Sequence, residues 1–165
     1  DAVRRGLVSP TWLVLSAPFL RLAPGRSRVA IEALPVLGIL APWATVRATE
    51  NVPLSTDPAR TRDFFQDPLT IRKNTLRTVF TLRRAQRLAR RANPARFAGL
   101  KAVLVVRGGQ DALVSKSAID AFSARMLAGG VNITALTFPD EGHELTFQTN
   151  VQADVQLWWR TARHA

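Results

Sequence analysis

The sequence predicts an α/β fold organised around a parallel β-sheet. Lys101–Ser115 contains a run of apolar, mostly β-branched residues at 103–106, which is typical of a strand buried on both faces. Gly108 and Gly109 end this strand because they let the chain leave the sheet by a tight turn. A second apolar segment, Asn132–Phe138, follows after an amphipathic stretch. The order strand, helix, strand indicates a parallel pair with a right-handed crossover.

The first elements of the chain are short. Asp1–Gly6 is interpreted as the last turns of a helix, with Gly6 as its C-cap. Because the sequence begins with Asp rather than Met, we interpret it as the later part of a longer chain. Trp12–Ser16 predicts a short buried strand that Ala17-Pro18 stops. From there to about Arg96 we expect no further strand.

The segment Leu20–Glu50 is apolar and is interrupted by prolines, which predicts short helices broken at those prolines. Its apolar side chains exceed what one packed stripe needs: Leu34, Val36, Leu37, Ile39, Leu40 and Trp43. Core packing is the first interpretation. The alternative is a lid that lines an apolar substrate entrance or touches a membrane.

Helix-start signals follow. Ser55, Thr56 or Asp57 can cap a helix that begins at Pro58, and Asp67-Pro68 repeats the signal. Asp67 itself is interpreted as a cap or turn residue rather than a site.

Thr70–Ala92 predicts a long amphipathic helix that Asn93-Pro94 ends. Its apolar stripe consists of Leu76, Val79, Phe80, Leu82, Ala85, Leu88 and Ala89. Its other face is basic and carries no acid: Arg72, Lys73, Arg77, Arg83, Arg84, Arg87, Arg90 and Arg91. Two further amphipathic helices are expected, Ser117–Leu127, closed by Gly129-Gly130, and Thr149–Ala162.

Composition sets broad bounds. The 165 residues suffice for one domain, and no segment reaches the ~18 uninterrupted apolar residues of a spanning helix. Without a secretory signal pattern, a cytoplasmic or peripheral-membrane protein is favoured over a secreted one. The absence of cysteine excludes disulfides and thiolate metal sites. The net charge of +11 fits binding to nucleic acid or to an anionic membrane, or an arginine-rich proteome.

The chemistry centres on Asp111 and His143. Asp111 follows the strand at 103–106, at the sheet edge where catalytic groups gather, and His143 lies on the loop after the next strand. An Asp and then a His, each beyond a buried strand, are two members of a Ser–Asp–His triad in that chain order. The carboxylate of such a triad accepts a hydrogen bond from the imidazole Nδ1–H and fixes the tautomer. His164, near the C-terminus, is interpreted as a solvated tail residue.

The motifs together resemble the C-terminal half of an α/β-hydrolase of the monoacylglycerol lipase and lysophospholipase type. The matching segments, in order, are LVLSAP at Leu13–Pro18, LSTDP at Leu54–Pro58, Asp67-Pro68-Leu69, VRGGQDALVS at Val106–Ser115, FPDEGHEL at Phe138–Leu145 and a closing helix that bears tryptophans. The resemblance implies that Asp111 is the triad acid and His143 the triad base. It implies hydrolysis of a lipid-like carboxylic ester, such as a monoacylglycerol or lysophospholipid, with no cofactor or metal.

The resemblance also divides the chain. Residues 1–20 would hold the end of the nucleophile helix and the first visible core strand, residues 21–94 a helical cap, and residues 95–165 the core with the triad Asp and His. The predicted fold class is therefore the C-terminal part of an α/β-hydrolase parallel sheet with a helical cap insertion. Haloperoxidase, peptidase and dehalogenase-like members of this superfamily stay open as relatives.

The family's nucleophile elbow, G-x-S-x-G, does not occur in the chain. The serines that are present lack its context: Ser9, Ser16, Ser27, Ser55, Ser115, Ser117 and Ser123. We expect the nucleophile and oxyanion hole just upstream of Asp1, which makes this chain a fragment; a naturally short, non-catalytic protein is the alternative. Alone, the chain should be inactive, because an acid and a base without a nucleophile form no acyl-enzyme. It should also be poorly stable, because central strands would become open edges.

Other interpretations stay open. Asp111 could serve only as a turn residue, and His143 could bond only to backbone. His143-Glu144 is similar to the start of a zinc-protease motif, but the position of its second histidine is Phe147, so no metal site is expected.

The basic helix at 72–91 supports a rival function, a non-catalytic module that binds nucleic acid or anionic surfaces. No nucleic-acid motif accompanies it, so no nucleic-acid partner is expected. A third possibility is a basic cap that holds the enzyme against anionic lipid headgroups.

Overall fold

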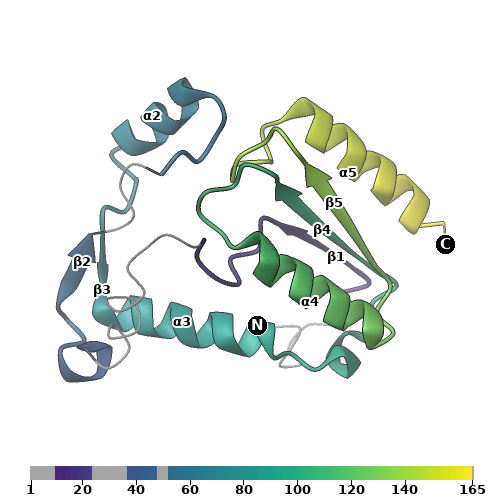
Figure 1. Ribbon diagram of the computed structural model, residues 1–165, viewed down its shortest axis with the longest axis horizontal. Coiled ribbons are helices and arrows are strands. Elements are labelled where there is room, and N and C mark those ends of the chain that lie inside the picture. The colour runs from purple at the N-terminus through teal and green to yellow at the C-terminus, as the bar shows by residue number, and fades with distance from the viewer. Residues whose placement is uncertain (1–9, 24–36, 48–51, 165) are drawn as a thin grey trace.

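The computed structural model describes residues 10–23, 37–47 and 52–164 (Figure 1). The predicted helix end at Asp1–Gly6 and much of the predicted broken helices between Leu20 and Glu50 lie outside the described residues. Among the residues described, no helix has the length and apolarity to cross a bilayer.

The centre of the molecule is a three-stranded parallel sheet in the order β1-β4-β5. Its strands are β1 (Trp12–Ser16), β4 (Ala102–Gly108) and β5 (Ile133–Phe138). β4 is buried along nearly its whole length, as a run of β-branched residues in a central parallel strand requires. The positions of these strands match the sequence predictions, and the parallel α/β fold class is confirmed. The prediction that Trp12–Ser16 is buried is wrong, because β1 has a partner strand on one side only and none of its residues is buried.

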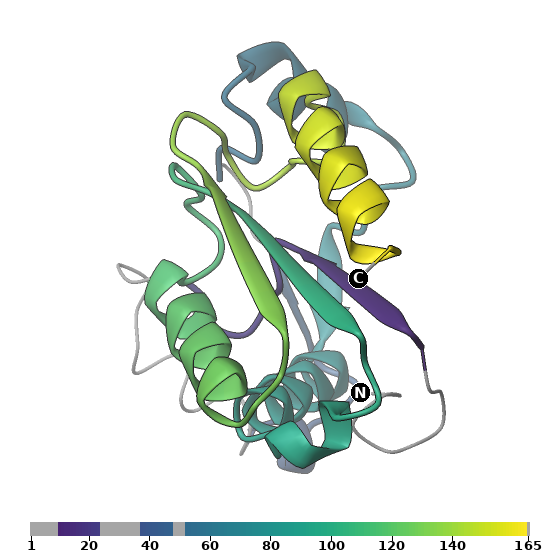
Figure 2. The ribbon, with the colours of Figure 1, turned by 90° about the vertical axis from the view of Figure 1, so that its right-hand side faces the viewer.

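Helices α4 (Lys116–Ala128) and α5 (Thr149–Ala162) lie on opposite sides of this sheet (Figure 2). α4 buries Ile119, Phe122 and Met126 in the main hydrophobic core, and α5 adds Val151. α4 ends at Gly129, as predicted, and Gly130 adopts a positive φ of 83°. The core thus fills both faces of β4, and the strand's carboxyl end is held in place by the packing below it.

The chain between β1 and β4 forms β2 (Thr45–Arg47), α2 (Pro58–Gln66), β3 (Lys73–Thr75), α3 (Leu76–Arg90) and the short 3₁₀ helix η1 (Pro94–Phe97). β2 and β3 pair antiparallel, so the expectation of no strand between Ser16 and Arg96 is wrong. The predicted helix from Thr70 begins only at Leu76, because residues 73–75 pair with β2. The Thr75 side chain then caps the helix by accepting a hydrogen bond from the Thr78 N–H at 3.1 Å.

α2 begins as the sequence predicts. The Asp57 carboxylate accepts a hydrogen bond from the Ala59 N–H at 2.9 Å, and Pro58 is the first helical residue. Asp67-Pro68, in contrast, starts no second helix. Asp67 is the C-cap of α2, and its carboxylate accepts from the Leu69 N–H at 2.8 Å, which makes this segment a turn.

Candidate functional site

Two loops meet at the carboxyl edge of the sheet. Because β4 and β5 are parallel neighbours, with Gly108 opposite Phe138, the loops that follow them leave the sheet side by side. The Gly109 N–H donates to the Phe138 carbonyl at 2.7 Å, and the Gln110 N–H donates to the Glu141 carbonyl at 2.9 Å. These bonds join the loop that carries Asp111 to the loop that carries His143.

The structure brings the side chains of Asp111 and His143 into contact. His143 Nδ1 lies 2.8 Å from Asp111 Oδ2. The other carboxylate oxygen, Oδ1, accepts hydrogen bonds from the N–H groups of Leu113 at 2.7 Å and Val114 at 2.9 Å. The Asp111 side chain is 1% exposed and the His143 side chain 23% exposed. The carboxylate is therefore fixed in the protein interior, while the imidazole reaches toward the surface.

The surroundings of Asp111 favour its charged form. Burial opposes the charge, but the hydrogen bonds from His143, Val114 and Leu113 and the attraction of a charged His143 outweigh it, so the pKa of Asp111 lies below its ordinary value. An ionised carboxylate on Nδ1 requires that this nitrogen carry the proton. The free lone pair of the neutral ring then sits on Nε2, which has no hydrogen-bond partner among the described residues.

Glycines allow the close approach of these loops. A Cβ atom at Gly108 would collide with the carbonyl oxygens of Gly142 and Glu141. A Cβ atom at Gly142 would lie 2.9 Å from the carbonyl oxygen of Leu54. That carbonyl also accepts a hydrogen bond from the Glu144 N–H at 2.8 Å. The segment at Leu54 thus closes over the His143 loop, a contact that sequence reasoning missed. The only indication of this contact in the sequence was the LSTDP segment that begins at Leu54.

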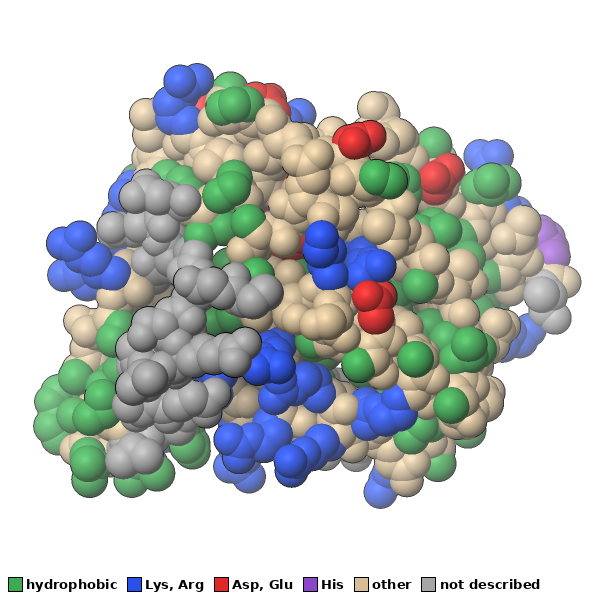
Figure 3. All heavy atoms as spheres, in the orientation of Figure 1, with side chains coloured by type: hydrophobic (Ala, Val, Ile, Leu, Met, Phe, Trp, Pro, Cys, Tyr) green, Lys and Arg blue, Asp and Glu red, His purple; other side chains and the backbone are tan. Residues whose placement is uncertain are grey.

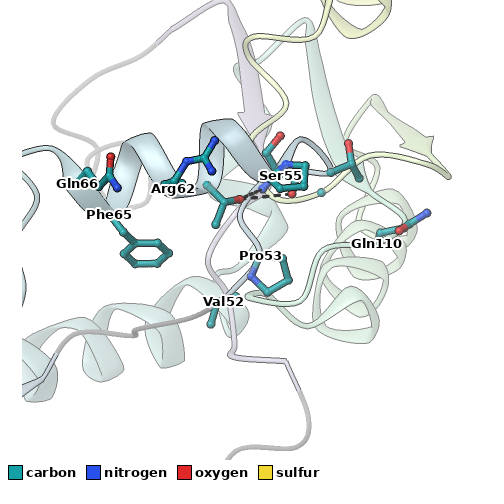
Figure 4. A pocket seen from close by; sticks show the side chains of 11 residues that line it. Val52, Pro53, Ser55, Arg62, Phe65, Gln66 and Gln110 are labelled. Carbon is teal, nitrogen blue, oxygen red and sulfur yellow. Dashed lines mark hydrogen bonds between the residues drawn. The ribbon is translucent and has the colours of Figure 1, made fainter.

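A pocket of about 670 Å³ opens beside this pair of loops. Figure 4 shows Phe65 and Gln66 of α2 at one end and Gln110 at the other. Gly142, which precedes His143, also lines it. The lining contains one cation, Arg62, and no acidic side chain. A substrate of moderate size bound here would lie against the loop that carries His143.

The serines that the sequence offered do not complete this site. None of the described ones hydrogen-bonds to His143. Ser115 caps α4 by accepting from the Ala118 N–H, and Ser55 accepts from the Asp57 N–H at 3.1 Å. Ser9 and Ser27 lie outside the described residues. His164 is exposed near the C-terminus and contacts Arg163 at 3.1 Å, so the structure does not bring it to the site.

Across residues 10–23, 37–47 and 52–164 there is no group of three or more His, Asp or Glu side chains placed to hold an ion.

Comparisons with known proteins give one family and several similar structures. The model of the family described as Serine aminopeptidase, S33 matches residues 7–150. A search of curated proteins found no match. Among solved structures, the chain is similar to the monoacylglycerol lipase of Paleococcus ferrophilus, with 16% identity, a TM-score of 0.78, and coverage of 99% of this chain and 63% of that one.

Two further structures are similar. A soluble variant of monoglyceride lipase from Saccharomyces cerevisiae, solved in complex with a substrate analog, has 13% identity and a TM-score of 0.73 over 92% of this chain and 53% of that one. A thermostable carboxyl esterase from Bacillus coagulans, in complex with glycerol, has 16% identity and a TM-score of 0.68 over 94% and 56%. At such identities the likeness shows the fold. The chain spans between 53% and 63% of the length of these relatives.

Proposed function

The chain belongs to the family described as Serine aminopeptidase, S33, a family of α/β-hydrolases, and from this membership we propose that the whole protein is a serine hydrolase of carboxylic esters. The observation that carries the proposal is the 2.8 Å contact between His143 Nδ1 and the buried carboxylate of Asp111. In a protein of this family, such a pair at the carboxyl ends of neighbouring parallel strands is suited to general acid–base catalysis.

We assign the roles on the basis of this contact. Asp111 accepts a hydrogen bond from Nδ1–H, so His143 presents the lone pair of Nε2 to a serine hydroxyl and takes its proton during attack on the ester carbonyl. The carboxylate then stabilises the imidazolium, which returns the proton to the leaving alcohol. A water molecule, activated by the same nitrogen, hydrolyses the acyl-enzyme. Asp111 stays ionised throughout, in keeping with the lowered pKa of its carboxyl.

We place the serine nucleophile outside these 165 residues. The chain has no G-x-S-x-G elbow, and it spans only 53% to 63% of its structural relatives. The 165-residue chain by itself is therefore expected to show no ester hydrolysis above background, measured with a chromogenic short-chain ester. Turnover that the His143→Gln change abolishes in this short chain would contradict this placement.

A lipid-like acyl group suits a largely apolar cavity that adjoins the first pocket. A second cavity of about 280 Å³ is lined by Phe19, Leu54, Phe64, Phe65, Ile71 and Leu113, among others, and shares Phe65 with the pocket beside His143. The family description names an aminopeptidase, but an aminopeptidase needs an anionic group to bind the free amino terminus of its substrate. The lining of the first pocket has Arg62 and no acid, which favours an uncharged ester such as a monoacylglycerol, or a lysophospholipid with its negative phosphate, over a substrate with a free ammonium group.

The test is substrate choice by the whole protein. We expect hydrolysis of a monoacylglycerol and little hydrolysis of an aminoacyl anilide. His143→Gln should lower kcat by about 10⁴-fold or more, whereas the matched change His164→Gln should leave it unchanged. Equal losses in the two variants, or a preference for the anilide, would overturn the proposal.

Contact with a membrane is a further part of the proposal. Apolar side chains near β2 point into solvent, with Leu40 69% and Trp43 75% exposed. The basic side chains of α3 belong to the same stretch of chain between β1 and β4 and could attract anionic lipids. The change Leu40→Ser should weaken co-sedimentation with anionic vesicles. The control Leu157→Ser, at a leucine of α5 that is 61% exposed, should not weaken it. Equal binding by both variants would rule out this surface.

A further inference from the structure

Another concave site lies between α3 and α4, and it shares no residue with the two cavities described above. Its volume is about 330 Å³. The lining consists of Arg21, Arg90, Ser117, Ala118, Ala121, Phe122 and Arg125. The three arginines come from three separate parts of the chain, and none of these residues takes part in the proposed ester hydrolysis.

The fold fixes the walls of this arginine pocket. Ser117, Ala121 and Arg125 are spaced by four residues and so share one face of α4, where the small Ala121 leaves room for the hollow. Arg21 is held beside the start of α4, because its carbonyl accepts a hydrogen bond from the Ser115 N–H at 2.8 Å. Arg90 is the last residue of α3.

The charge in the arginine pocket has no counterion among the described residues. Neither Arg21, Arg90 nor Arg125 forms an ion pair there, and the lining holds no acid. Partial burial lowers the pKa of Arg90, and repulsion from Arg21, Arg83, Arg87 and Arg91 lowers it further. Figure 3 shows basic side chains gathered over the region where α3 and α4 lie in Figure 1. Uncompensated positive charge of this kind favours an anion.

Arg125 adds a second, independent sign of a ligand. Its Nη1 donates to the Ala92 carbonyl at 3.0 Å, and its guanidinium carbon lies 5.9 Å from the centre of the Phe122 ring. These contacts hold the guanidinium in one orientation. Its Nη2 is nevertheless buried without a hydrogen-bond partner among the described residues. A buried N–H donor is costly unless an acceptor satisfies it.

We propose that the arginine pocket binds a phosphate group, carried by a soluble phosphomonoester or by a lipid headgroup, at a site separate from the ester-hydrolysing site. Guanidinium groups pair with phosphate oxygens through two parallel N–H bonds, and several arginines can share one tetrahedral dianion. The Ser117 hydroxyl and the positive end of the α4 dipole add to the same attraction. A concave pocket of about 330 Å³ has room for a terminal phosphate group, whereas the backbone of a nucleic acid needs an extended groove.

The first test is calorimetric titration of the whole protein with inorganic phosphate in chloride buffer of matched ionic strength. We expect saturable binding that weakens about tenfold in Arg90→Gln and in Arg125→Gln. The control Arg160→Gln removes the same charge from α5 and should have no effect. Arg90→Gln keeps the test valid should Arg125→Gln fail to fold. Absence of binding, or equal weakening in Arg160→Gln, overturns the proposal.

Further binding experiments distinguish a soluble phosphomonoester from a lipid headgroup as the source of the phosphate. Glycerol phosphate that competes with inorganic phosphate supports a soluble phosphomonoester. Binding to phosphatidylcholine vesicles only when they contain phosphatidic acid, lost in Arg90→Gln and competed by inorganic phosphate, supports a lipid headgroup. Tight binding of duplex DNA that requires Arg90 but that inorganic phosphate does not displace contradicts the proposal. Hydrolysis of a soluble ester should be the same in Arg90→Gln and the unmodified protein, since the two sites are separate.

Discussion

The two halves of the described molecule bury their apolar residues very differently. β4 is buried along nearly its whole length, and α4 buries three large side chains, whereas α2 buries none of its residues. Among the described residues between β1 and β4, the exposed large apolar ones are Leu37, Ile39, Leu40, Trp43, Phe64, Leu69, Ile71 and Leu82. The difference teaches that the core around β4 specifies the fold and places Asp111 and His143. The region between β1 and β4 instead presents an apolar surface that a ligand, a membrane or another part of the protein can cover.

Within the central sheet, too, one strand is buried and another is partly exposed. β4 pairs with a strand on each side, but β1 pairs only with β4 among the described strands. Val14 of β1 is 44% exposed, although its neighbour across the ladder, Leu104, is fully buried. An edge strand of this kind is prone to pair with another chain. This fits the expectation that the 165 residues alone are poorly stable.

The largest stability effect is expected at Leu104. Its change to Ala leaves a cavity in the centre of the core and should lower the free energy of unfolding of the whole protein by about 2–5 kcal/mol. Leu40→Ala, at an exposed leucine near β2, should change it by no more than about 0.5 kcal/mol. The denaturant midpoints of the two variants measure this difference in stability. Equal losses of stability in the two variants would contradict it.

A smaller loss is expected where the two loops touch. Gly108→Ala places a Cβ against the carbonyl oxygens of Gly142 and Glu141, which should cost about 1–3 kcal/mol of stability. Because the His143 loop must shift, kcat should also fall about 10²-fold. Gly99→Ala is the control, since a Cβ there meets nothing within 4 Å. Full activity in Gly108→Ala would show that the tight approach of the loops is not needed.

The smallest expected effect is the pH dependence that Asp111 contributes. Its pKa in the folded protein lies below the ordinary value of 3.8, so the unfolded chain binds more protons at pH values between the two. The stabilisation is therefore complete above 3.8 and is lost as the pH falls through the lower native pKa. The stability difference between the unmodified protein and Asp111→Asn should shrink on acidification through this range. A difference that grows instead would reverse the assigned direction.

Much of the core could be predicted from local sequence. The β-branched run at β4 and the Gly108-Gly109 turn predicted the strand and its end, and Asp57-Pro58 predicted the start of α2. The α/β-hydrolase resemblance, which rested on the order and spacing of short motifs, is confirmed by the family match over residues 7–150. The catalytic roles of Asp111 and His143 stay predictions, although the structure brings the two side chains to hydrogen-bond distance.

What escaped prediction depends on contacts between distant residues. β2 and β3 are three residues long and exist because they pair with each other, so neither carries a pattern of its own. The bond from Glu144 to the Leu54 carbonyl joins the His143 loop to a segment far away in the sequence. The arginine pocket likewise combines Arg21, Arg90 and Arg125, whereas the sequence showed only a basic helix face.

The measurement that tests the central claim most directly is kcat of the whole protein, with an ester substrate, for Asp111→Asn beside Asp140→Asn. Both changes remove one carboxylate from the same sheet edge, but only Asp111 contacts His143. We predict a loss of about 10⁴-fold in Asp111→Asn, because the imidazole loses the partner that fixes its tautomer, and no loss in Asp140→Asn. Full activity in Asp111→Asn would contradict the assignment of this pair as the acid and base of the enzyme.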